Sequence, residues 1–433
     1  MLVRHALYSQ GNRYGVAVLL DFFIYRVDNT SPYLPMQIIR GKKLKRIFSD
    51  HWEYIVEKYC HLLKRPAILI NVSKMLQCGT EQMGFHLFRC PTCLAEKKVF
   101  HTCKSRFCSP CGIAQTKRWR EYFNALFAPT AYKHIIFNPP SEFRDYFKIG
   151  KRRYFQMLFE TAAQTLADWY TQKGYLPGIM AVIHTFGRDE KFSPHIHCLM
   201  TCGGLDNSRS HWITPVEHGF IPHQFLRASF QRHFLQNMQA LWRTQVMETV
   251  PLSRHFMFTP LFQSKLVKTV VGKIWFIWVG RSIANAFHAV SYVARYTKRP
   301  PIAESKILGY DGKSVTFTYK EHRMTRPEVE TLSALEFLER LLPHIPDVNF
   351  RVVRYAGFYS NRLRSSLLPI VFALKNSNRT YAQAKEHLAK LTCWWRRRVE
   401  AITRIDPLMC DICLIPLTLF SVVYSVRKAD PYG

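Results

Sequence analysis

The chain has 433 residues, 48% of them hydrophobic, and carries 61 Lys and Arg against 30 Asp and Glu, a formal net charge of +31. This length and hydrophobic content exclude an intrinsically disordered chain and allow roughly two or three domains with a sizeable core. A positive excess of this size favours a polyanionic partner, and nucleic acid is the commonest one. An anionic membrane surface, or a basic protein without a specific partner, is the alternative.

No segment predicts secretion or insertion into a membrane. The apolar stretch 15–25 is interrupted by Asp21 and no small-residue cleavage site follows it. The uncharged run 412–426 contains Pro416 and is shorter than the roughly 20 residues that span a bilayer, so we expect a buried C-terminal segment there. In an intracellular protein, the 12 cysteines favour metal binding over disulfides.

The chain divides into four consecutive parts. Residues 1–35 match nothing downstream and are interpreted as an extension. Residues 36–128 hold an amphipathic basic helix over 38–59, the cysteine-rich region and a second basic helix over 114–127, and we expect a zinc-binding, DNA-binding domain there. Residues 129–330 are expected to form a second domain, and 331–433 a C-terminal accessory region.

Strands and helices alternate over short connections in the second half of the chain. Apolar runs bounded by turn residues predict strands over 134–137, 179–185, 195–201 and 315–319. Helical periodicity predicts helices over 154–173, 222–247, 282–298 and 332–342. This order favours an α+β fold with a central, mainly antiparallel sheet flanked by helices.

Two cysteine hooks predict a structural zinc site. Each hook presents two thiolates from a tight turn, and two hooks together supply the four ligands of a tetrahedral zinc site. The ion then stands in for the core that so short a segment cannot build. The hooks are Cys90-x2-Cys93 and Cys108-x2-Cys111. Further candidate ligands nearby are Cys78, Cys103, His86 and His101, so the sequence leaves open whether one or two zinc ions bind.

A histidine pair forms the second candidate metal site. Strand alternation places His195 and His197 on one face of the sheet and Ile196 on the other. Two imidazoles on one rigid strand can chelate a divalent ion, although a chain with 18 histidines is expected to contain about one such pair by chance. His184 is the first candidate for a third ligand, because its strand is expected to pair with that of His195.

A tyrosine pair lies on a predicted helix. Tyr292 and Tyr296 are four residues apart, which places both on one helical face. Arg295, Lys298 and Arg299 surround them and are candidates to bind a DNA phosphate. With 21 tyrosines in the chain, such a pair also occurs by chance, and the alternative for both motifs is an ordinary core or surface stripe.

Together, the two motifs describe one reaction. A free tyrosine has a pKa near 10 and is a poor nucleophile at neutral pH, so attack on a phosphodiester needs a cation on the phosphate oxygens. Phosphate oxygens would complete the coordination of Mg²⁺ or Mn²⁺ beside the imidazoles. Tyrosine attack gives a 5′-phosphotyrosine and a free 3′-hydroxyl, and a second tyrosine can attack another strand while the first holds its end.

The order of these motifs resembles the two-tyrosine HUH transposases of bacterial rolling-circle insertion sequences, relatives of the ISCR elements. The resemblance extends from about Met36 to Cys413. Besides the hooks and the two pairs, it is carried by Cys78-Gly79-Thr80, Cys103-Lys104-Ser105-Arg106-Phe107-Cys108, His134-Ile135-Ile136-Phe137-Asn138-Pro139-Pro140, His184-Thr185-Phe186-Gly187, Val315-Thr316-Phe317-Thr318-Tyr319-Lys320 and Arg354-Tyr355-Ala356-Gly357.

This resemblance implies a transposase zinc-binding domain followed by an HUH nuclease fold, with the family histidines at His195 and His197 and its nucleophiles at Tyr292 and Tyr296. Related proteins often have another histidine where this chain has Ser193. Cys410-x2-Cys413 looks like a half-hook without a recognisable partner, and the apolar tail after it is unlike a typical family ending.

The implied substrate is single-stranded DNA or a hairpin at the ends of an insertion sequence, with structural Zn²⁺ and catalytic Mg²⁺ or Mn²⁺ as cofactors and no membrane partner. Two alternatives stay open: a rolling-circle replication initiator or relaxase with the same chemistry, and an inactive zinc-containing DNA-binding relic.

Overall fold

The computed structural model describes residues 43–58, 65–187, 191–215, 221–297, 301–319, 327–375, 380–390, 396, 400 and 404–424. The extension predicted at residues 1–35 lies outside them. Contacts divide the chain into two units, which are described separately. The larger unit takes its described residues from 43–76 and 104–390, and the smaller unit from 77–103 and from 396 onwards.

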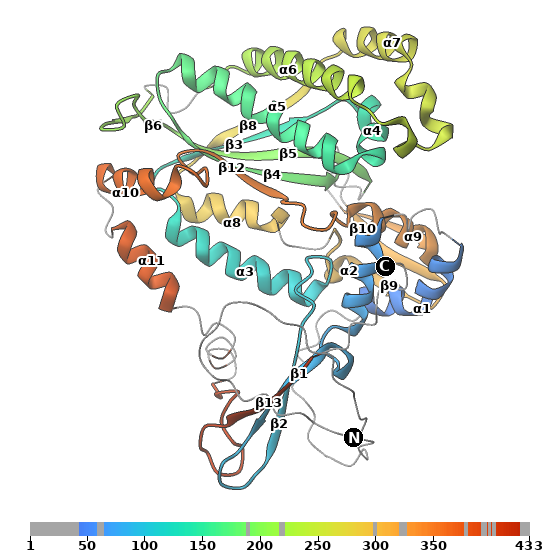
Figure 1. Cartoon of the computed structure of the whole chain (residues 1–433), viewed down its shortest axis with the longest axis vertical. Coiled ribbons are helices and arrows are strands. Elements are labelled where there is room, and N and C mark those ends of the chain that lie inside the picture. Colours follow the sequence, from blue (N-terminus) through green and yellow to red (C-terminus); the bar gives the residue numbers. More distant parts are fainter. Residues whose placement is uncertain are drawn as a thin grey trace. The chain divides into compact units, whose positions relative to one another are not determined.

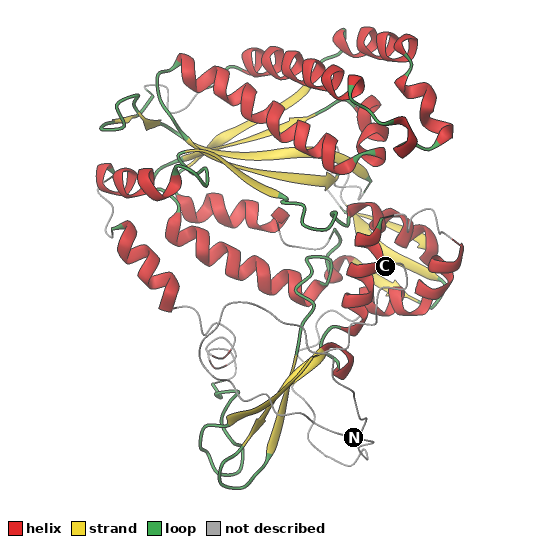
Figure 2. Cartoon of the chain, viewed as in Figure 1, coloured by secondary structure: helices red, strands yellow, loops and turns green. Residues whose placement is uncertain are grey.

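A five-stranded antiparallel sheet is the centre of the larger unit (Figures 1 and 2). The strand order is β12-β4-β5-β3-β8, so that β5 and β4 form a hairpin and β8 and β12 are the edges. The strands are β3 (Tyr132–Asn138), β4 (Gly178–Phe186), β5 (Phe192–Thr201), β8 (Phe276–Ile283) and β12 (Val353–Gly357). β12 lies beyond residue 330, where the nuclease domain was expected to end, so the sheet uses part of the expected accessory region.

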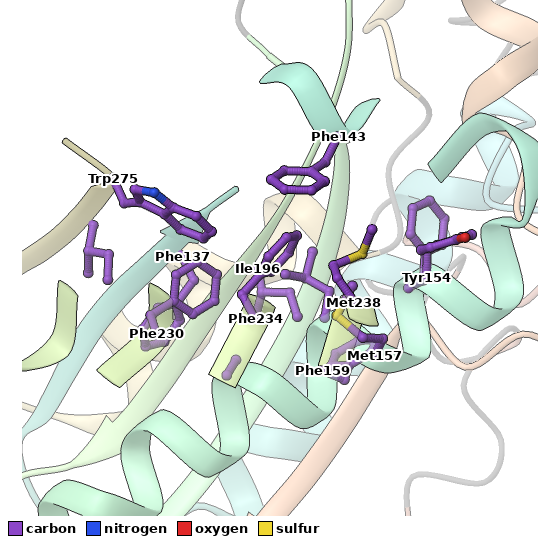
Figure 3. Packing of buried hydrophobic residues seen from close by; sticks show 14 of the residues in the cluster. Phe137, Phe143, Tyr154, Met157, Phe159, Ile196, Phe230, Phe234, Met238 and Trp275 are labelled. Atoms are coloured by element: carbon purple, nitrogen blue, oxygen red, sulfur yellow. The ribbon is translucent and has the colours of Figure 1, made fainter. Parts of the chain in front are cut away.

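One face of this sheet is mainly apolar. Alternation directs Ile135, Ile183 and Ile196 to it, and helices α4 (Arg144–Ile149), α5 (Lys151–Gln172) and α6 (His223–Arg243) cover them. Aromatic side chains dominate the cluster, as Figure 3 shows for Phe143, Phe234 and their neighbours. Burial on this scale supplies most of the apolar stabilisation of the unit.

The opposite face carries Tyr132, Met180, Val182 and Leu199 and packs against helices α3 (Ser109–Leu126), α8 (Ala286–Thr297), α10 (Arg364–Leu374) and α11 (Tyr381–Lys390). The sheet therefore lies between two helical layers, as Figure 2 shows. The α+β fold class, with helices on both sides of a central antiparallel sheet, is confirmed.

The rest of the larger unit consists of smaller elements. A three-stranded sheet of order β11-β10-β9 lies with α1 and α9. The remaining bounds are α1 (Lys43–Lys58), α2 (Pro66–Gln77), β6 (Gly204–Leu205), β7 (Trp212–Ile213), α7 (Pro260–Val271), β9 (Ile307–Tyr310), β10 (Ser314–Tyr319), β11 (Glu328–Ser333) and α9 (Ala334–Leu341). Short 3-10 helices of the larger unit span Ser141–Phe143, Met247–Thr249, Leu252–Phe258, Glu304–Lys306 and Leu342–His344, and one of the smaller unit spans Glu81–Met83.

The smaller unit contains a three-stranded antiparallel sheet of order β13-β1-β2. Its strands are β1 (Gly84–Arg89), β2 (Glu96–Phe100) and β13 (Thr418–Tyr424), so the middle strand pairs with a strand more than three hundred residues later in the chain. Only a few buried side chains, Cys90, Cys410 and Leu417, form its core.

Three expectations change with the structure. The helix expected from residue 282 begins at Ala286, because β8 continues to Ile283 and the Asn285 side chain then accepts the His288 amide. The helix expected from 332 begins at Ala334, because Ser333 caps it. The C-terminal run 412–426 was expected to be buried, but in its described part, 412–424, most side chains are exposed: Ile412 is 68% exposed, and Leu417 is the buried residue of this part.

Among the helices in the described ranges, none combines the length and the apolar character that crossing a bilayer requires.

Phe234 tests the apolar face. It is fully buried, with ring centroids 4.9 Å from Phe143 and 5.2 Å from Trp275. We predict that Phe234→Ala lowers the free energy of unfolding by about 3–5 kcal/mol, because it removes a large buried ring and leaves a cavity. Urea denaturation followed by tryptophan fluorescence measures the change. Phe256→Ala is the control, because that ring is 51% exposed, and equal losses for both variants would contradict this core.

Candidate active site

Strand pairing brings three histidines together in the larger unit. His184 of β4 pairs with His195 of β5, and His197 pairs with Val182 one step further along the hairpin. One ring nitrogen of each of His184, His195 and His197 lies within 4.8 Å of the others. The predicted convergence of these three side chains is thus present in the structure, on one face of the sheet.

Hydrogen bonds fix how two of these rings present their nitrogens. His195 Nδ1 lies 2.7 Å from the Ser193 carbonyl oxygen, so Nδ1 carries the proton and donates it, and Nε2 keeps its lone pair. That Nε2 atom is 3.3 Å from His184 Nδ1. His197 Nδ1 is 2.9 Å from His134 Nε2 of β3, which orients the His197 ring. Support of this kind from a neighbouring group is usual for metal-binding histidines.

Burial keeps these imidazoles neutral. It lowers the pKa of His134 and of His195 to about 4, and the neighbouring His195 adds to the effect on His134. The pKa values of His184 and His197 are lowered further by burial and by the adjacent histidines. Neutral imidazole is the form that binds a metal ion, so the donor set fits a divalent cation.

Helix α8 packs on the same face of the sheet as the histidines. Its residues Ala289, Val290 and Val293 belong to the buried cluster that contains Val182, the register partner of His197. The helix begins two residues after β8, beside the sheet end where Ile283 pairs with Tyr132, and contacts β3, β4 and β8 (Figure 1). The histidine layer and the predicted nucleophile helix therefore share one side of the sheet.

The predicted nucleophiles lie on the last two turns of this helix. The structure describes the backbone of α8 at Tyr292, Arg295 and Tyr296 but not those side chains. Lys298 and Arg299 lie outside the described residues. The roles of these five residues stay predictions.

Two residues that the sequence analysis did not assign complete the histidine layer. His134 contacts His197, and the Trp278 ring of edge strand β8 lies 5.1 Å from His134, centroid to centroid. Trp278, Ile136 and His197 are register neighbours, which places Trp278 on the histidine face. Strand alternation places His134 on the same face as the other even-numbered residues of β3. Its contacts with His197 and Trp278 depend on the pairing of β3 with β5 and β8, which the pattern of one strand does not give.

The cysteines are grouped differently from the expectation. The sequence analysis combined Cys90 and Cys93 with Cys108 and Cys111. In the structure, the thiols that meet those of Cys90 and Cys93 are the ones of Cys410 and Cys413, because pairing of β13 with β1 returns the C-terminal hook to this place.

The remaining cysteine candidates belong to both units. In the smaller unit, the Cys103 amide donates to Cys78 Sγ at 3.3 Å. In the larger unit, Cys108 and Cys111 are buried at the N-terminal end of α3. The sequence analysis left open whether one or two zinc ions bind, and a second ion stays a prediction.

Comparison with known proteins finds similarity to transposases. Residues 178–366 match the family model described as "Putative transposase", and residues 47–138 match the "Transposase zinc-binding domain". The chain is 28% identical over 386 residues, 86% of its length and 88% of the relative, to the transposase for insertion sequence element IS801 of Pseudomonas savastanoi pv. phaseolicola.

A further relative is the putative transposase y4qJ of Sinorhizobium fredii, 28% identical over 295 residues, which are 67% of this chain and 74% of the relative. No solved structure matches the chain significantly. The chain is thus similar to insertion-sequence transposases over most of its length, with a transposase zinc-binding domain at 47–138 and a putative transposase domain at 178–366.

The histidine layer makes the metal-free protein sensitive to acid. Between an ordinary pKa near 6.5 and the lowered value of about 4, the unfolded chain binds more protons at His134 and His195 than the folded chain. We therefore predict that the free energy of unfolding in chelator decreases as pH falls from about 6.5 to about 4.

Urea titrations at several pH values measure this slope. The double variant His134→Gln/His195→Gln should flatten it, whereas His211→Gln, whose side chain is 80% exposed, should keep the wild-type slope. Identical slopes in all three proteins would contradict the burial of the histidine layer.

Proposed function

We propose that this transposase nicks and rejoins single-stranded DNA by attack of Tyr292 and Tyr296, in a rolling-circle type of transposition through 5′-phosphotyrosine intermediates. The observation that carries the proposal is the layer of His184, His195 and His197 on the sheet face against which α8, the tyrosine helix, packs. The histidine pair or the tyrosine pair alone could occur by chance. Neither motif by itself implies that both lie on the same side of one sheet.

The histidine layer would hold the catalytic cation. His184, His195 and His197 supply three neutral nitrogen ligands, which leaves positions for phosphate oxygens on Mg²⁺ or Mn²⁺. When bound, the ion withdraws electron density from the phosphate and stabilises charge on its oxygens. His134 acts as a positioning residue, because its contact with His197 Nδ1 directs the opposite nitrogen of that ring towards the ligand site.

The tyrosines would carry the covalent step. A tyrosine oxygen forms a bond to phosphorus, the bond from phosphorus to the 3′ oxygen breaks, and the phenol proton is balanced by the proton that the released 3′-hydroxyl takes up. The product is a 5′-phosphotyrosine, and attack by a 3′-hydroxyl reverses the step without ATP. The second tyrosine allows a second strand to be cut while the first end is held, and Arg295, Lys298 and Arg299 are proposed to contact the phosphates.

Exposed aromatic side chains favour a single-stranded substrate. Trp278 and Phe276 lie two residues apart on edge strand β8 and are 40% and 49% exposed. The Trp278 indole extends over Gly280, where a Cβ atom would come within 2.4 Å of the ring, so glycine at this position lets the ring lie along the strand. Unpaired bases stack on such rings, whereas the bases of a duplex are not accessible to them.

Similarity over 86% of the chain to an insertion-sequence transposase favours transposition over replication initiation or conjugative transfer. The net charge of +31 suits a polyanionic substrate, with work on DNA in the bacterial cytoplasm and at the nucleoid. We also propose that the nuclease domain continues past residue 330 through β12, with the zinc-binding domain at 36–128 before it.

The tyrosine assignment is tested with a labelled single strand that carries the terminal sequence of the element, incubated with Mn²⁺ or Mg²⁺. We predict a covalent protein–DNA adduct on a denaturing gel. Tyr292→Phe/Tyr296→Phe should abolish it, and His195→Ala should reduce it at least about a hundredfold, in the range expected for loss of electrostatic stabilisation of the transition state.

The matched control is Tyr54→Phe, because Tyr54 is 41% exposed on α1. This variant should form the adduct at the wild-type level. An adduct that still forms in the double tyrosine variant would overturn the assignment of Tyr292 and Tyr296 as nucleophiles. DNA binding without any adduct in the wild-type protein would favour the inactive relic.

The stacking surface is tested by Trp278→Ala. We predict single-stranded DNA affinity reduced by roughly 5- to 150-fold, the equivalent of about 1–3 kcal/mol for one stacked base, with duplex affinity unchanged. Fluorescence anisotropy at one fixed salt concentration measures both. Trp278→Phe should restore most of the affinity and Tyr54→Ala should leave it intact; an equal loss for duplex and single strand would exclude base stacking at Trp278.

A further inference from the structure

Two cysteine hooks meet in the smaller unit although they lie at opposite ends of the described chain. We call residues 90–95 the N-terminal hook and residues 410–415 the C-terminal hook. The N-terminal hook connects β1 to β2, and the C-terminal hook shortly precedes β13, which pairs with β1. The family model for the zinc-binding domain ends at residue 138, so it does not include the C-terminal hook.

The two hooks have the same backbone conformation. In each, the amide of the second cysteine donates to the sulfur of the first, Cys93 to Cys90 and Cys413 to Cys410, both at 3.5 Å. Amide donors to a sulfur stabilise the thiolate that a metal ion needs.

The residue after each pair is a leucine in the left-handed region, at φ 61° for Leu94 and 54° for Leu414. The amide of each leucine donates to the carbonyl of the first cysteine of its hook, at 3.1 and 3.0 Å. A β-carbon makes this conformation costly, so its occurrence at both hooks points to a shared structural demand.

The sulfurs of the two hooks form one cluster. The four Sγ atoms lie within 4.8 Å of one another, and Cys93 Sγ is 3.5 Å from Cys410 Sγ. Tetrahedral zinc with bonds of about 2.3 Å places its sulfur ligands roughly 3.8 Å apart, so the cluster has the dimensions of a zinc–thiolate site. Cys90 and Cys410 are almost fully buried.

The four Sγ atoms lie so close together that the thiols cannot all ionise unless a cation compensates their charge.

We propose that a single Zn²⁺ bound by Cys90, Cys93, Cys410 and Cys413 joins the two hooks, so that the zinc-binding domain is completed by the C-terminal part of the chain. The ion closes a loop between Cys93 and Cys410, which lie 317 positions apart in the chain. It also explains why β13 stays on β1 although most of that strand is exposed and only three buried residues form the local core.

The test measures zinc per chain in the full-length protein by elemental analysis. Cys410→Ser/Cys413→Ser should lose about one zinc relative to the wild type, and Cys90→Ser/Cys93→Ser should lose the same one. The quadruple variant should lose no more than either double variant. Cys202→Ser is the matched control, because that buried cysteine belongs to the larger unit and should keep the full zinc content.

Hydrogen exchange gives an independent readout. Both double variants should lose amide protection in β1, β2 and β13 and keep it in β3, β4 and β5, which also shows that the larger unit has folded. Wild-type zinc content in Cys410→Ser/Cys413→Ser would overturn the proposal. So would a quadruple variant that loses two zinc ions, because each hook would then bind its own, and so would a disulfide between the hooks in protein purified without oxidant.

Discussion

The register of the β4–β5 hairpin is the constraint on which the site depends. Pairing of His184 with His195 puts the imidazoles on one face of the sheet while Ile183 and Ile196 enter the apolar core on the other. A slip of one residue would exchange these faces, so the same hydrophobic burial that stabilises the sheet also aims the histidines. The register of the β4–β5 hairpin therefore determines both the geometry of the site and the burial that stabilises the fold.

The two faces of the central sheet have different roles. The face under α5 and α6 is mainly apolar and supplies rigidity, as Figure 3 illustrates with its closely packed aromatic rings. The face under α8 buries four imidazoles, which costs solvation and lowers the pKa of each one. Binding of a cation would offset that cost. Burial also keeps the imidazoles in the neutral form that binds a metal ion.

Local sequence patterns predicted the strands, helices and shared faces that depend on residues close together in the sequence. Alternation located β3, β4 and β5 and the shared face of His195 and His197, and helical spacing located α5, α6 and α8. Contacts set by long-range pairing were missed. The His134–His197 contact needs the register of β3 with β5, and the partner of the Cys90 hook lies more than three hundred residues away. A hook looks the same in sequence whichever second hook completes its site.

The account's central claim is that the histidine layer and the tyrosines of α8 act on one phosphate, and locating the covalent bond tests it most directly. After reaction with a single-stranded element end and Mn²⁺, protease digestion and mass spectrometry identify the residue that carries the nucleotide remnant. The account predicts a phosphodiester on Tyr292 or Tyr296, present only when His195 and His197 are intact. A remnant on any other residue, or one that forms equally without these histidines, would contradict it.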